Sequence, residues 1–110
     1  MKFALLLYED DAERVVKSDE EVAVCLAYAA AMEKAGILVG GERLRPAQSA
    51  TTVRIADGAA RVLDGPYAEV KEQLGGFHLI DVPDLDTALA WARRCPSAQR
   101  GRVEVRAIWP

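Results

Sequence analysis

The chain alternates between short apolar segments typical of strands and two longer segments with helical periodicity. Residues 2–8 form the first strand, in which one alternating set is Phe3, Leu5 and Leu7. The other set, which includes Leu6 and Tyr8, is also largely apolar, so this strand is expected at the centre of a sheet covered on both faces. Further strands are predicted at residues 37–44, 51–56, 61–63, 77–82 and 102–108.

The first long helix is predicted to begin after Ser18, because Ser18 and Glu21 have the spacing of a capping box. It should run to about Ala35 and end at Gly36. Its expected core stripe is Val22, Cys25, Leu26, Ala29 and Met32.

The second long helix is predicted to start at Asp84, which is positioned to cap it, and to end before Pro96. An i, i+3, i+4, i+7 stripe marks its buried face. The residues of this stripe are Leu85, Ala88, Leu89 and Ala92.

Residues 64–81 link the middle of the chain to the strand at residues 77–82. Asp64, Gly65 and Pro66 signal a turn. Residues 68–74 are predicted to form one or two helical turns, which the pair Gly75-Gly76 would terminate.

The order strand, helix, strand, hairpin, strand, helix, strand predicts an α+β fold of the ferredoxin-like, split β-α-β type with an added hairpin. Asp57-Gly58 marks the hairpin turn. Two helices cover one face of a sheet, and the other face here also carries apolar residues. The pattern therefore predicts a homodimer that packs sheet against sheet, a dimeric α+β barrel.

Composition narrows the classes of function. The 110 residues suit one domain, spanning 1–110, with 51% hydrophobic and 28% charged residues and a net charge of −3. No basic cluster favours nucleic-acid binding, and no apolar segment is long enough to cross a membrane. With no leader-like start, a cytoplasmic protein is expected.

No cofactor or metal is expected. Cys25 and Cys95 are far apart in the sequence and are interpreted as small buried apolar residues without a disulfide. With a single histidine, the chain has too few ligands for a Cys/His zinc site. The glycines form no nucleotide-binding pattern.

His78 and Asp64 are the candidates for catalysis. His78 could serve as a general base or contact a ligand, or it could be a histidine hydrogen-bonded within the sheet or the dimer interface. Asp64 could orient a base or bind substrate, or it could close the Asp-Gly-Pro turn through an Asx-type hydrogen bond.

Four further residues are candidates for ligand binding. Lys71 and Glu72 could present an anion site and a carboxylate, or form a solvated helical face. Arg106 shares a strand face with Glu104, so it could anchor an anion or form a salt bridge. Tyr8 could place its hydroxyl in the same cleft or pack in the core.

Several motifs together resemble the YCII-related family, which is named for a D-G-P-F motif. That motif appears here as Asp64-Gly65-Pro66-Tyr67, with tyrosine in place of phenylalanine, and residues 71–76, 79–82 and 103–106 continue the family pattern. The resemblance implies a dimeric ferredoxin-like fold and an association with sigma-factor transcription genes.

A better-studied branch of this family is thought to use a His–Asp pair whose histidine lies nearer the N-terminus. No histidine precedes His78 in this chain, so that pair is not carried over.

The sequence thus supports a small cytosolic protein that binds a small molecule in a cleft at the dimer interface. One alternative is a small lyase-, isomerase- or oxygenase-like enzyme using Asp64 and His78. Another is a regulatory partner of a sigma-factor system.

Overall fold

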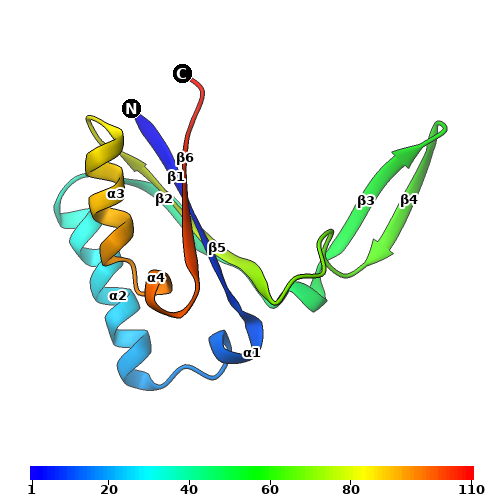
Figure 1. Cartoon of the computed structure of the whole chain (residues 1–110), viewed down its shortest axis with the longest axis horizontal. Coiled ribbons are helices and arrows are strands. Elements are labelled where there is room, and N and C mark those ends of the chain that lie inside the picture. Colours follow the sequence, from blue (N-terminus) through cyan, green and yellow to red (C-terminus); the bar gives the residue numbers. More distant parts are fainter.

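The computed structural model describes residues 1–110. Four strands form one antiparallel sheet in the order β2-β5-β1-β6, with β1 at the centre as predicted (Figure 1). The bounds of these strands are β1 Lys2–Asp10, β2 Leu38–Arg43, β5 Glu72–Asp81 and β6 Arg102–Ala107. The fold is therefore α+β, and the strands of two β-α-β units interleave in the sheet.

The two long helices are α2 (Asp19–Lys34) and α3 (Leu85–Arg94). The predicted capping box is confirmed, because the Ser18 hydroxyl accepts from the Glu21 amide while the Glu21 carboxylate accepts from the Ser18 amide. Gly36 follows α2 with φ +73°, and Asp84 caps α3 by accepting from the Thr87 amide. Three short helices complete the list: α1 (Asp11–Arg14), η1 (Ala47–Ser49) and α4 (Ser97–Arg100).

Both long helices cover the same face of the sheet and close one hydrophobic core. Phe3, Leu5 and Ile80 supply this core from the sheet. The helices and the segments that flank them supply Tyr28, Met32, Val82, Ala88, Ala92 and Cys95.

The stripe predicted on the first helix is partly wrong. Met32 is buried as predicted, but Leu26 is 67% exposed and Val22 is also exposed. Tyr28, which lies outside the predicted stripe, is buried. Helix α2 carries alanine and valine around most of its circumference, so the position of its apolar residues does not single out a buried side. On α3, Ala88 and Ala92 are buried as predicted, but Leu85 lies in the first turn and is half-exposed.

The opposite face of the sheet is open. Leu6, Phe77 and Leu79 lie on this open face: Leu6 is opposite Phe77 in the β1–β5 pairing, and Leu79 is two residues further along β5. None of the three belongs to the core cluster or packs against it. The alternation predicted for β1 is therefore confirmed, with one apolar set under the helices and the other on the open face.

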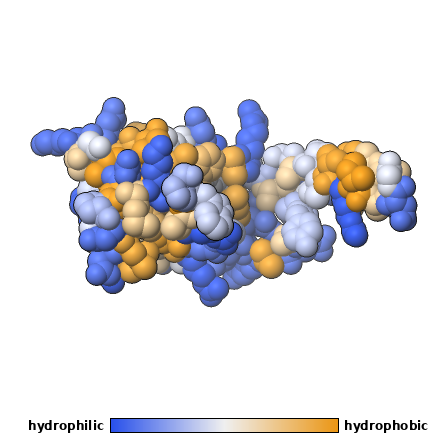
Figure 2. Space-filling model, turned by 90° about the horizontal axis from the view of Figure 1, so that it is seen from above, coloured by the Kyte–Doolittle hydropathy of each residue, from blue (hydrophilic) through white to orange (hydrophobic).

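The hairpin forms a separate two-stranded arm that projects away from the body of the molecule (Figure 1). Its strands are β3 (Thr51–Ala56) and β4 (Ala59–Asp64). Asp57 and Gly58, with φ of 50° and 76°, make the predicted tight turn. Figure 2 shows hydrophobic surface on this arm, in line with the exposure of Val53, Ile55, Val62 and Leu63.

The helical turns predicted at residues 68–74 are not present. Strand β5 begins at Glu72, and Gly75 and Gly76 lie inside it. A Cβ at Gly76 would lie 2.9 Å from the carbonyl oxygen of Glu42 on the adjacent strand. These glycines therefore permit β5 to pack closely against its neighbours and do not terminate a helix. A segment of seven residues also gains too little from helical hydrogen bonds to form a helix alone.

None of the helices combines the length and the apolar character of a membrane-spanning helix.

Candidate functional site

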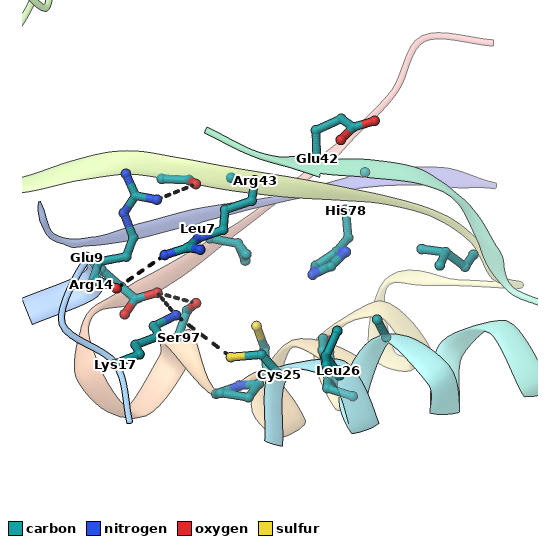
Figure 3. Close-up of a pocket in the computed structure, with 18 of the residues that line it drawn as sticks. Leu7, Glu9, Arg14, Lys17, Cys25, Leu26, Glu42, Arg43, His78 and Ser97 are labelled. Atoms are coloured by element: carbon teal, nitrogen blue, oxygen red, sulfur yellow. Dashed lines mark hydrogen bonds and ion pairs between the residues drawn. The ribbon is translucent and has the colours of Figure 1, made fainter. Parts of the chain in front are cut away.

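A cavity of about 410 Å³ lies between α2 and the helix-covered face of the sheet, beneath β2 and β5. Figure 3 shows the residues around it. Apolar groups form much of the wall, among them Leu7, Tyr28 and Leu38. The polar side chains that line it include Glu9, Arg14, Lys17, Cys25, Arg43, His78 and Ser97.

His78 enters this cavity from β5. It lies opposite Leu5 in the β1–β5 pairing, so it points to the helix-covered face, and its ring packs edge-to-face on Tyr28 with centroids 5.7 Å apart. Burial lowers the pKa of His78 below its ordinary value of 6.5. The imidazole is therefore neutral at pH 7 and offers one hydrogen-bond donor and one acceptor.

Gly41 leaves room for the His78 ring. A Cβ at Gly41 would lie 3.1 Å from Nδ1 of His78 and 2.5 Å from the carbonyl oxygen of Phe77. The glycine pair in β2, which suggested a close backbone approach, thus brings β2 against β5 at the wall of the cavity.

Glu9 occupies the polar end of the cavity and is only 3% exposed. Its Oε2 accepts from the Ser97 hydroxyl at 2.7 Å, and its Oε1 accepts from Arg100 Nε at 3.1 Å. Lys17 Nζ lies 3.8 Å from Oε2. The buried carboxylate is stabilised by one hydroxyl and two cations, as a charge removed from water requires.

Lys17 has a less complete set of partners. Its side chain is 11% exposed, and its one hydrogen bond runs to the sulfur of Cys25 at 3.8 Å. Arg43 reaches toward the same end of the cavity (Figure 3) and donates only to the carbonyl oxygen of Arg14, at 3.4 Å.

Arg14 is a buried structural anchor. Its Nη1 donates to the carbonyl oxygens of Leu44 at 2.7 Å and Gly75 at 3.2 Å, while Nε and Nη2 donate to Oδ1 of Asp11. The other Asp11 oxygen accepts from the Ala47 amide at 2.7 Å. This network joins α1, the end of β2, β5 and the base of the arm, and so holds one wall of the cavity.

The two cysteines lie in different surroundings. Cys95 is 2% exposed, and burial raises the pKa of its thiol. Cys25 is partly exposed in the cavity, where Lys17 Nζ and Arg100 Nη2 lie 3.8 and 3.9 Å from its sulfur. The expectation of a small buried residue therefore holds for Cys95, whereas Cys25 belongs to the polar wall of the cavity.

Comparison with known proteins agrees with the motifs in the sequence. Residues 1–110 match the YCII-related domain over their whole length. The chain belongs to the YCII-related domain family. An uncharacterized protein of Rhizobium meliloti (strain 1021) is 40% identical over 114 residues, which cover 98% of this chain and 92% of the relative.

Six residues of this YCII-related protein are candidates for catalysis or ligand binding on the sequence alone, and of these only His78 lines the cavity. Tyr8, Lys71 and Glu72 line a separate surface depression, where Glu72 pairs with Arg102 at 3.5 Å. Arg106 is exposed and pairs with Glu104 of its own strand, away from the cavity. The predicted ligand-binding residues are thus not brought together with His78.

Asp64 is the last residue of β4, at the base of the arm and far from the turn at its tip, and it is exposed. Its side chain accepts no hydrogen bond, so the expected Asx-type closure of the turn is not present. The turn depends instead on Gly65, with φ +100°, whose amide donates to the carbonyl oxygen of Ala50 at 2.7 Å.

Sequence reasoning missed Glu9, Arg14, Lys17 and Ser97. Glu9 carried a signal, because it continues the inward alternation of Phe3, Leu5 and Leu7, and a charge in a buried register needs partners. Lys17 lies in a polar segment that resembles an ordinary exposed connection, so nothing local indicates its burial.

Proposed function

We propose that this YCII-related protein binds a small molecule in the cavity between α2 and the sheet. The observation that carries the proposal is the cavity itself, whose volume of about 410 Å³ falls within the range of small-molecule sites. The site proposed here therefore lies on the helix-covered face of the sheet and not, as the sequence suggested, at an interface between two sheets.

The lining supports a binding role. Leu7, Tyr28 and Leu38 provide apolar surface that a ligand could cover. His78 and Lys17 provide polar groups that could orient it. Such a combination of an apolar wall and a few convergent polar groups is typical of specific ligand sites.

Filling the cavity tests this function. Ala29 lines the cavity from α2, whereas the neighbouring Ala30 is exposed and does not. Ala29→Phe should therefore occlude the site, and Ala30→Phe is the matched control on the same helix. A panel of small neutral, cationic and anionic aromatic molecules would be screened by saturation-transfer NMR against wild type and both variants.

We expect at least one member of the panel to bind wild type and Ala30→Phe, and Ala29→Phe to lose that signal while melting as a folded protein. Absence of binding to wild type across the panel, or equal binding to Ala29→Phe, would contradict the proposal.

We also propose that the protein is a homodimer of the sheet-to-sheet, ferredoxin-like type. The open face with Leu6, Phe77 and Leu79 supports it, because these side chains are apolar and the molecule's own helices do not cover them. The cavity lies on the other side of the sheet, so the two features serve separate roles.

A further inference from the structure

We propose that the ligand of this cavity is a small organic acid, with one carboxylate held between Lys17 and Arg43 and an apolar body directed toward Tyr28 and His78. This inference rests on the proposed binding function and adds the chemical class of the ligand.

The first support is the incomplete coordination of Lys17. An ammonium group has three donors, yet the only partner within hydrogen-bonding reach of this one is the sulfur of Cys25 at 3.8 Å. Oε2 of Glu9 is also 3.8 Å away and already accepts from Ser97. Lys17 is thus ion-paired with Glu9 at long distance, but its ammonium donates to no oxygen, so it has donors free for an oxygen acceptor of a ligand.

The second support is Arg43. Its guanidinium reaches the same end of the cavity and makes one hydrogen bond, to the Arg14 carbonyl oxygen, with no carboxylate partner. A guanidinium presents its donors as a planar fork that matches the two oxygens of a carboxylate. Arg43 therefore provides a second cation from the opposite wall.

The balance of charge at this end points the same way. The basic residues of the lining are Arg14, Lys17 and Arg43, and the acidic ones are Glu9 and Glu42. Glu42 points away from α2 in Figure 3, so Glu9 is the carboxylate that faces these cations. Arg14 is paired with Asp11, and Lys17 is paired with Glu9. Arg43, which is exposed, is therefore the cation at this end that has no carboxylate partner, and the carboxylate of a ligand would supply one.

The part of the cavity around Tyr28 and His78 determines which chemical groups the remainder of the ligand can carry. Tyr28 packs against the neutral ring of His78, and Leu38 lies in the same wall. This region provides no charge for a second ionised group, and Glu9 repels additional negative charge at the polar end. A monocarboxylate with a compact apolar body fits both parts.

Phenylacetate and phenylacetamide test the class, because they share shape and differ in charge. Their affinities would be measured by NMR titration for wild type, Lys17→Met, Arg43→Met and Lys17→Arg. Lys34→Met, at the exposed end of α2, is the control for a general loss of positive charge.

We expect wild type to bind phenylacetate about tenfold more tightly than phenylacetamide, the scale of a hydrogen bond to a charged group. Lys17→Met and Arg43→Met should remove most of this preference without weakening the amide. Lys17→Arg should retain part of it, and Lys34→Met should leave it unchanged.

Equal or tighter binding of the amide would overturn the acid class, and so would a preference for phenylacetate that survives both methionine variants. A third outcome separates the two proposals. If neither compound binds, while neutral members of the panel bind wild type and do not bind the Ala29→Phe variant, the acid class fails and the proposed function stands. If nothing binds the cavity, both fail.

Discussion

The guanidinium of Arg14 occupies the space that a side chain at Gly75 would need. A Cβ at Gly75 would lie 2.6 Å from Nε and 2.8 Å from Cδ of Arg14. Because Arg14 also donates to the carbonyl oxygen of Gly75, the arginine lies directly against the strand backbone. Gly75, the first glycine of the Gly75-Gly76 pair, therefore has a packing role in this chain.

Gly75→Ala should destabilise the protein by about 1–3 kcal/mol, the usual cost of overpacking, because Arg14 cannot move without losing its hydrogen bonds. Gly40→Ala is the matched control, since a Cβ at Gly40 meets nothing within 4 Å. Urea denaturation of the two variants measures the difference. Equal stabilities would show that Arg14 relocates freely and does not hold the wall of the cavity.

Met32 and Leu85 both belong to the core stripes predicted from the sequence, but only Met32 is buried in the structure. Met32 is fully buried, so Met32→Ala should cost about 2–5 kcal/mol of unfolding free energy. Leu85 was expected in the core but is 51% exposed, so Leu85→Ala should cost less than about 1 kcal/mol. Denaturant melts that rank the two variants in the opposite order would contradict the packing described for α2 and α3.

His78 should titrate below its ordinary pKa of 6.5, because burial disfavours the imidazolium. Between the folded pKa and 6.5 the unfolded chain binds more protons than the native state. The associated stability is therefore complete above pH 6.5 and is lost as the pH falls through that window.

Because His78 is the only histidine in the chain, its Hε1 resonance in an NMR titration reports the pKa directly. Urea melts from pH 5 to 8 should show that His78→Gln removes part of the decline in stability on the acid side. A midpoint at or above 6.5 would mean that the ring is not buried as described.

The open face of the sheet predicts a dimer in solution. Size exclusion with light scattering should report about twice the 12.0 kDa of one chain at micromolar concentration. Leu79→Glu places a charge on this face and should shift the protein to the monomer. Leu85→Glu, on the helix side, should not. A 12.0 kDa species for wild type would rule out the dimer.

The elements were largely predictable because their signals are local. The capping box at Ser18, the turn at Asp57-Gly58 and the alternation from Phe3 onward each determine structure within a few residues. The segment 68–74 does not form the predicted helical turns, and its sequence does not show this because the role of Gly75 depends on Arg14, which is distant in the sequence.

The candidate site was much less predictable, because its residues are distant from one another in the sequence. Glu9, Lys17 and Ser97 meet only after β1, the connection to α2 and the segment after α3 are assembled. No short motif contains them. The titratable residues of the segment 64–81 are close together in the sequence, yet of these only His78 reaches the cavity.

The most direct test of the account is the position of the bound ligand. A titration of ¹⁵N-labelled protein with phenylacetate, followed in ¹H–¹⁵N spectra, should shift the amides of residues around the cavity, among them Cys25, Gly41, Gly76 and His78. Amide shifts confined to the open face, at Leu6 and Glu104, or to the arm, would contradict a binding site between α2 and the sheet.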